Sequence, residues 1–243
     1  MPATYRVVLV GPENPRNVGF VARAMLCFGA TELIVAGTAW TAPPAEALKT
    51  GVAALDILKG ARFVPTLAGA LRGCATAVAF SRRPTVLRQT EFDLPDAPAA
   101  LGRSGRTALV FGRESNGLTR EESALCPFLA RIPCRDGVSL NLGQAAAVAL
   151  FSMTNRAPAA AGGKAPRPAV ALDRMLGLWD FLGPKLSAAP RFTAARLQRV
   201  RQMLYGLNLD DENFDLLFAV MSELARPAAA RREARERKIG ANW

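Results

Sequence analysis

Short runs of apolar and β-branched residues alternate, along the first 154 residues, with segments in which apolar residues recur every three or four positions. The apolar runs predict five strands, at residues 6–10, 32–35, 75–80, 107–111 and 129–132. The helical spacing predicts helices between Pro15 and Gly29 and at residues 45–58, 66–71 and 142–154, with Thr66 as an N-cap. Strands that alternate with helices predict an α/β fold with a parallel sheet.

The pattern changes at residues 156–168, where proline, alanine and glycine dominate and no packed element is expected. Beyond this linker, three apolar stripes predict three short helices. They are formed by Leu172, Met175, Leu176, Trp179 and Leu182, by Leu197, Val200, Leu204 and Leu207, and by Phe214, Leu217, Phe218 and Met221. Residues 226–238 add six basic and two acidic side chains. We therefore divide the chain into a domain at 1–155, a linker at 156–168 and a basic helical extension at 169–243.

The charge of the chain favours a polyanionic partner. The net charge at pH 7 is +11, with 31 basic and 20 acidic residues. Residues 1–155 carry 16 basic and 11 acidic side chains and residues 156–243 carry 15 and 9, so the shorter C-terminal part is the more densely basic. Nucleic acid is the simplest such partner, ahead of a membrane surface, and composition does not distinguish RNA from DNA. A basic, solvated face without a partner is the alternative.

Several kinds of chemistry are disfavoured by what the sequence lacks. It contains no histidine, and its cysteines, Cys27, Cys74, Cys126 and Cys134, form no C-x-x-C pair. The commonest general base and metal ligand are therefore missing, and we expect neither a metal site nor a disulfide framework. No stretch approaches the ~20 apolar residues that span a bilayer, and the N-terminus does not resemble a signal peptide. We expect a cytoplasmic protein with no membrane-spanning segment.

Three polar segments lie near the ends of predicted strands. The first, G-P-E-N-P-R-N-V-G-F-V-A-R, runs from Gly11 to Arg23 across a loop and the start of a helix. Ligands of open α/β sheets bind at this edge. Its glycines are eight residues apart, unlike the G-x-G-x-x-G of dinucleotide-binding proteins, and Gly162-Gly163-Lys164 lacks the strand and the Ser/Thr of a phosphate-binding loop. Asn17 and Arg23 are about 120° apart on an ideal helix, so both face one site only if Asn17 lies at the helix start or before it.

The second segment, F-G-R-E-S-N-G-L, follows the fourth predicted strand, and the third, S-L-N-L-G-Q, precedes the Ala-rich helix. In the second, Gly112 allows close backbone approach and Gly117 allows a positive φ. Glu114 is placed either to shape that loop by accepting hydrogen bonds or to lie near a cationic ligand. In the third, Ser139 and Asn141 precede a helix whose free N–H groups can meet ligand oxygens; N-capping by one of the two is the alternative.

In residue type, order and spacing, these segments resemble the motifs of the SpoU/TrmH-type RNA 2'-O-ribose methyltransferases of the SPOUT superfamily, over residues 6–154. The resemblance implies S-adenosyl-L-methionine as cofactor. The catalytic residues that it implies are Arg23, Asn17, Glu114, Ser139 and Asn141. The cofactor-binding residues that it implies are Phe80, Ser81, Arg82, Gly112, Arg113, Gly117, Ile132, Ser139, Leu140 and Asn141. Phe80, Ser81 and Arg82 are assigned by position alone, and Arg113 is expected to contribute its backbone at most.

A looser likeness, over residues 191–217, is to the helical C-terminal extension of the TrmJ branch, which methylates tRNA in the anticodon loop. The family further implies a trefoil-knotted sheet and a homodimer. The expected function is therefore that of an S-adenosylmethionine-dependent RNA 2'-O-ribose methyltransferase with tRNA as substrate. An rRNA 2'-O-methyltransferase and a non-enzymatic RNA-binding protein with the same fold are the alternatives.

Overall fold

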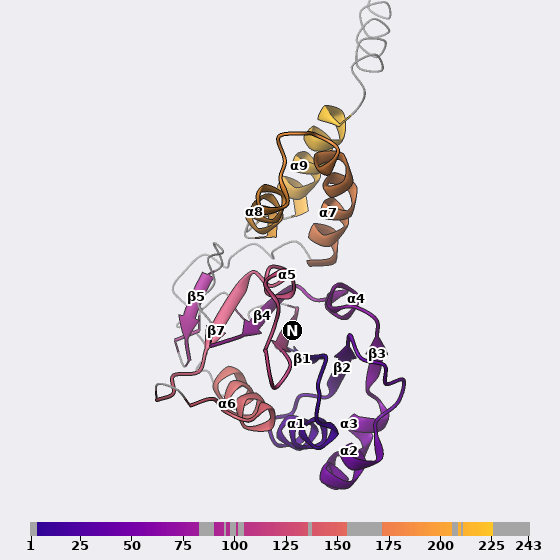
Figure 1. Cartoon of the computed structure of the whole chain (residues 1–243), viewed down its shortest axis with the longest axis vertical. Helices are drawn as coiled ribbons and strands as arrows, with labels where there is room; N and C mark the ends of the chain where they lie inside the picture. The colour runs from indigo at the N-terminus through magenta and orange to yellow at the C-terminus, as the bar shows by residue number, and fades with distance from the viewer. Residues whose placement is uncertain are drawn as a thin grey trace, which may run out of the picture.

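The computed structural model describes residues 4–82, 90–94, 96–97, 101, 105–135, 138–154, 172–205, 209 and 211–225. In this part of the chain, one parallel sheet has the strand order β3-β2-β1-β6-β4-β7-β5 (Figure 1). The strands are β1 (Thr4–Val10), β2 (Glu32–Ala36), β3 (Arg62–Val64), β4 (Thr76–Phe80), β5 (Thr90–Asp93), β6 (Arg106–Phe111) and β7 (Phe128–Arg131). Because all pairings are parallel, the carboxyl ends of the strands meet at one edge of the sheet.

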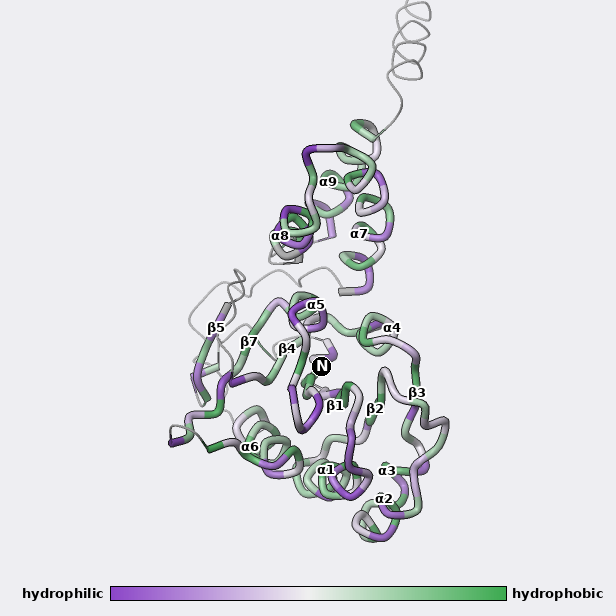
Figure 2. Tube along the Cα trace, in the orientation of Figure 1, coloured by the Kyte–Doolittle hydropathy of each residue, from purple (hydrophilic) through white to green (hydrophobic). Residues whose placement is uncertain are grey.

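Helices cover both faces of the sheet. One face carries α1 (Pro15–Cys27), α2 (Ala45–Thr50), α3 (Leu55–Lys59) and α6 (Leu142–Thr154), and the other carries α4 (Leu67–Leu71) and α5 (Arg120–Ser123) (Figure 1). In β1, Val7 and Leu9 pack with α1 and α6, whereas Val8 and Val10 pack on the side of α4. Burial on both faces explains the continuous apolar run at residues 7–10 of β1, visible as a green segment in Figure 2.

The five predicted strands are confirmed, with ends that differ by one or two residues. The single helix predicted at 45–58 is wrong, because the chain breaks at Gly51 into α2, a 3-10 helix (Val52–Ala54) and α3. The break accompanies a close approach to α1, since a Cβ on Gly51 would lie 3.1 Å from the Cα of Gly19. A Cβ on Gly19 would lie 2.1 Å from the Oγ1 of Thr50. The two glycines therefore let α2 pack directly on α1.

Two predicted helix ends are confirmed. The Thr66 hydroxyl accepts a hydrogen bond from the Gly69 N–H at the start of α4, and Gly29 has φ +74° just after α1. Strands β3 and β5 and helix α5 were not predicted, because each has only three or four residues. The predicted linker and the basic residues 226–238 lie outside the described residues, and the trefoil knot stays a prediction. No described helix is both long and apolar enough to cross a membrane.

The C-terminal extension contains the three predicted helices, α7 (Leu172–Ser187), α8 (Ala194–Tyr205) and α9 (Asp211–Leu224). Their buried residues Met175, Leu176, Leu178, Leu182, Leu204 and Phe214 belong to the apolar cluster that also contains Leu67 and Leu71 of α4. The Arg201 guanidinium adds a hydrogen bond to the carbonyl of Glu121 in α5, at 3.1 Å. The extension is thus packed on the sheet domain through α4 and α5. Leu207, predicted for the second stripe, lies outside the described residues.

Candidate functional site

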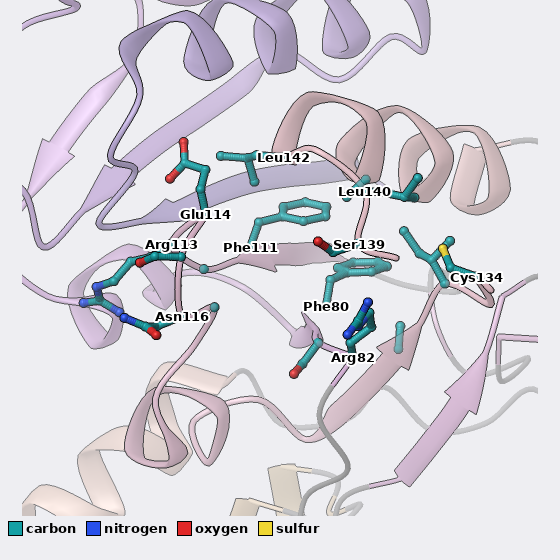
Figure 3. Close-up of a pocket in the computed structure, with 17 residues that line it drawn as sticks. Phe80, Arg82, Phe111, Arg113, Glu114, Asn116, Cys134, Ser139, Leu140 and Leu142 are labelled. Atoms are coloured by element: carbon teal, nitrogen blue, oxygen red, sulfur yellow. The ribbon is translucent and has the colours of Figure 1, made fainter. Parts of the chain in front are cut away.

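A pocket lies at the carboxyl ends of β4, β6 and β7 (Figure 3). The rings of Phe80 and Phe111, at the ends of β4 and β6, stack with centroids 4.6 Å apart and form an apolar wall. Figure 3 shows Glu114 on one side of these rings and Cys134 on the other, with Ser139 between. The pocket thus joins an apolar centre to polar loop residues, as small-molecule sites do.

Most of the residues predicted for cofactor binding line this pocket: Phe80, Ser81, Arg82, Gly112, Arg113, Gly117, Ile132, Ser139 and Leu140. Glu114, predicted as catalytic, lines it as well. Asn141, Asn17 and Arg23 are not among the lining residues. The sequence prediction missed Phe111, Ser115, Asn116, Ala130, Cys134, Leu142 and Ala145. Most of these lie next to a motif residue or end a strand, so their position at the carboxyl edge was the available signal.

Glu114 connects the first and second polar segments. Its carboxylate accepts hydrogen bonds from the backbone N–H of Glu13 at 2.8 Å and of Asn14 at 3.1 Å, and from the Nδ2 of Asn17 at 2.8 Å. Burial disfavours the ionised carboxylate, but the bonds from Asn17 and the backbone outweigh it and hold the pKa of Glu114 below 4.5. Glu114 is therefore a fixed negative charge that also shapes the loop.

Asn141 connects the third segment to the first. Its Nδ2 donates to the Oδ1 of Asn17 at 2.9 Å, and Asn17 is 3% exposed in the first turn of α1. The Oδ1 of Asn141 accepts from the Gly143 N–H at 2.8 Å, and the Gln144 side chain accepts from the Asn141 N–H at 3.1 Å. Asn141 is thus the residue that caps α6, which settles the N-capping alternative. A chain of hydrogen bonds runs from Glu114 through Asn17 to Asn141.

The loop after β6 closes on itself. A Cβ on Gly112 would lie 2.2 Å from the carbonyl carbon of Gly117, which has φ +65°, so both positions require glycine. Arg113 and Gly117 exchange backbone hydrogen bonds of 3.2 and 2.8 Å. The Arg113 guanidinium turns to Glu122 in α5, at 2.9 and 3.0 Å, and this pairing raises the pKa of Arg113. Arg113 therefore supports the loop with its side chain as well as its backbone.

Arg23 lies apart from the pocket. It is exposed on α1, on a surface that also carries the exposed apolar side chains of Phe20 and Leu26. Helix α6 packs beside α1 and adds exposed Val148 and Phe151. Within one chain, the predicted residues Asn17, Glu114 and Asn141 are joined by hydrogen bonds and Ser139 faces the pocket, whereas Arg23 is not brought to it.

Known proteins are similar to this chain in sequence. A tRNA (cytidine/uridine/adenosine-2'-O-)-methyltransferase TrmJ from Pseudomonas aeruginosa is 37% identical over 153 residues, which are 61% of this chain and 59% of that enzyme. The tRNA (cytidine/uridine-2'-O-)-methyltransferase TrmJ from Klebsiella pneumoniae is 28% identical over 235 residues, 90% of this chain and 95% of that enzyme. The alignment with the Pseudomonas enzyme thus leaves about two fifths of its length unmatched.

The fold is also that of a solved relative. The crystal structure of TrmJ from Z. mobilis superposes with a TM-score of 0.81 at 24% identity and covers 92% of this chain and 100% of that one. A model of the SpoU rRNA methylase family matches residues 4–151, which include all seven strands and the pocket. The chain therefore belongs to the SpoU rRNA methylase family.

Proposed function

We propose that this protein transfers a methyl group from S-adenosyl-L-methionine to a ribose 2'-hydroxyl of tRNA. The observation that carries the proposal is the junction of the three motifs: Glu114, Asn17 and Asn141 form one hydrogen-bonded chain beside an apolar pocket. Both TrmJ relatives are named as tRNA 2'-O-methyltransferases, which supports tRNA as the acceptor. A tRNA substrate implies a cytoplasmic enzyme.

The pocket suits the chemistry of this cofactor. Ile132 and Leu140 would contact the adenine, and the backbone of Gly112 and Gly117 would bind polar groups at close range. Glu114, whose pKa is lowered, lines the pocket and supplies a negative charge that would attract a cationic ligand. When bound, S-adenosylmethionine supplies a methyl group that is already electrophilic, so the protein must mainly align a hydroxyl with it.

Arg23 would act on the acceptor. In the transfer, the ribose oxygen bonds to the methyl carbon as the carbon–sulfur bond breaks, and the hydroxyl proton leaves to solvent. A guanidinium with a pKa above ~12 is a poor base, so Arg23 would hold a neighbouring phosphate and stabilise the developing alkoxide. Arg23→Ala is expected to lower kcat about 100-fold or more, while exposed Arg72→Ala, at the amino edge of the sheet, serves as the control. Near-normal transfer by Arg23→Ala at saturating RNA and cofactor would refute this role.

A homodimer would bring Arg23 to a pocket. Phe20 and Leu26 of α1, the helix that carries Arg23, and Val148 and Phe151 of the neighbouring α6 are exposed apolar side chains, of the kind that marks a protein interface. Burying this surface against a second copy would set Arg23 of one protomer near the pocket of its partner. Mixing Arg23→Ala protomers with protomers defective in cofactor binding should then restore part of the activity. Complete failure of restoration would argue for sites confined to one chain.

The helical extension would bind the RNA. Arg191, just before α8, and Arg199, within α8, are exposed and are suited to phosphate contacts. Since α7 shares a core with the sheet domain, charge reversal is a cleaner test than truncation. Arg191→Glu with Arg199→Glu should weaken tRNA binding and reduce its salt dependence, without changing cofactor affinity, whereas exposed Lys59→Glu should have little effect. Unchanged tRNA affinity would leave the extension a structural role only.

The acceptor is tested with labelled S-adenosylmethionine, unmodified tRNA and unmodified rRNA. Transfer to tRNA supports the proposal, and transfer to rRNA alone would keep the chemistry and replace the substrate. No transfer to either RNA, despite cofactor binding measured by calorimetry, would favour a non-enzymatic RNA-binding protein.

A further inference from the structure

Glu13, which lies outside the predicted site, holds the tip of the loop that lines the pocket. It belongs to the loop between β1 and α1. Its carboxylate accepts two hydrogen bonds from a single residue, from the Ser115 N–H at 3.1 Å and from the Ser115 hydroxyl at 2.6 Å. Ser115 itself lines the pocket. A carboxylate that accepts both a backbone and a side-chain donor fixes a residue in position and orientation.

Hydrogen bonds also run in the opposite direction between the same two loops. Glu114, the neighbour of Ser115, accepts from the backbone N–H groups of Glu13 and Asn14. Residues 13–14 and 114–115 therefore exchange four hydrogen bonds between loops that are about one hundred residues apart in sequence. Each loop contributes one carboxylate, which accepts hydrogen bonds from the other loop. Neither loop can therefore shift without breaking hydrogen bonds to a charged group.

We propose that Glu13 and Ser115 form a latch that positions the methyl donor relative to the acceptor, an inference that rests on the proposed function. The loop of residues 112–117 is one wall of the pocket, and the loop of residues 11–14 leads into α1, which carries Asn17 and Arg23. The latch sets the distance between these two parts. Glu13 and Ser115 are positioning residues in this account, because neither needs to touch the reacting atoms.

The latch should affect the rate of transfer more than cofactor binding. Without it, the loop keeps the backbone pair of Arg113 and Gly117 and the bonds to Glu114, so the pocket itself is retained. A misplacement of about 1 Å between reacting groups can cost about 100-fold in rate. Because other bonds still join the loops, we expect a smaller loss, about tenfold in kcat.

The test compares Ser115→Ala, Glu13→Ala and the double variant in the full-length protein. Glu13→Ala should lower kcat at saturating tRNA and cofactor about tenfold, with the dissociation constant for S-adenosylmethionine changed less than about threefold. Ser115→Ala, which keeps the backbone bond, should lose less. The double variant should be no slower than Glu13→Ala, because Glu13 is the shared acceptor of both bonds. Ser115→Thr, which keeps a hydroxyl, should retain most of the activity.

Glu46→Gln, an exposed glutamate in the first turn of α2, is the matched control and should behave as wild type. The proposal would be overturned if Glu13→Ala had the kcat of wild type. It would also be overturned if the fold-losses in kcat of the two single variants multiplied in the double variant. It would also be overturned if cofactor affinity fell in parallel with kcat, which would indicate a distorted pocket. Failure of the proposed function looks different, since the wild-type protein itself would then transfer no methyl group to RNA.

Discussion

Replacing Asn17 with aspartate changes one group at the centre of the hydrogen-bonded chain. The Oδ1 that accepts from Asn141 is retained, but the Nδ2 that donates to Glu114 becomes a carboxylate oxygen. Two carboxylates would then face each other across 2.8 Å, and they can coexist there only by sharing a proton. The substitution keeps the size of the side chain, so its effect reports on charge.

The magnitude follows from the cost of that proton. Holding a carboxyl of ordinary pKa 4.5 protonated at pH 7 costs about 3.4 kcal/mol, at 1.36 kcal/mol for each pH unit. Glu114 is partly exposed, and solvent screening reduces the repulsion, so we expect about half of that, near 1.5 kcal/mol. At pH 5 protonating the carboxyl costs little, and the expected loss in the free energy of unfolding is below about 0.5 kcal/mol.

Urea unfolding of wild type, Asn17→Asp and Asn17→Ala at pH 5, 6, 7 and 8 measures this difference. The shared proton gives the folded variant a carboxyl pKa above its unfolded value, and a penalty of about 1.5 kcal/mol corresponds to about one pH unit. The free energy of unfolding of Asn17→Asp should therefore be level from pH 8 to about 6 and rise as the pH falls from about 6 to 5. Asn17→Ala removes both hydrogen bonds without adding charge, and its loss, about 2 kcal/mol, should stay flat over this range. A flat profile for Asn17→Asp as well would refute the contact between Asn17 and the Glu114 carboxylate.

Other predictions concern packing and acid stability. Gly19→Ala should lower the free energy of unfolding by about 2 kcal/mol or more, because the added Cβ would lie 2.1 Å from the Thr50 hydroxyl. Gly177 in α7 has open space around it, so Gly177→Ala should instead raise the free energy of unfolding by about 0.5–1 kcal/mol. Burial raises the pKa values of Glu32, Glu114 and Glu122, but hydrogen bonds and ion pairs lower them by more. These carboxylates therefore stabilise the fold above about pH 4.5, and their contribution is lost as the pH falls through their lower folded pKa values. The thermal midpoint should therefore be flat above pH 5.5 and fall below pH 4.5, and Glu114→Gln should reduce that acid slope; an unchanged slope would contradict the assignment for Glu114.

The sequence predicts the sheet domain well because its signals are local. Strands that are buried on both faces contain continuous apolar runs, such as residues 7–10 of β1, and Thr66 and Gly29 have the residue types that helix ends require. The break at Gly51 was not predictable, because it depends on the approach of α2 to α1, between segments some thirty residues apart. Short elements such as β3 and α5 are too brief to show a period.

The candidate site was predicted through residue types, and its connections were not. The resemblance gave Asn17, Glu114 and Asn141, but the hydrogen bonds that join them span about 100 residues and exist only in the folded chain. Glu13 was missed for the same reason, since its partner Ser115 lies 102 positions away. Arg23 and Asn17 were expected to face one site only if Asn17 lay at the helix start or before it; Asn17 lies in the first turn of α1, and Arg23 is exposed on α1, outside the residues that line the pocket.

The most direct test of the account is to identify the nucleoside that carries the methyl group. Unmodified tRNA is incubated with the protein and labelled S-adenosylmethionine and digested with a nuclease, and the fragments are separated by mass to map the labelled nucleotide. We expect label on the ribose 2'-oxygen of an anticodon-loop nucleotide, and a large loss of that label with Arg23→Ala. Label on a base, or no label on tRNA despite measurable cofactor binding, would contradict it.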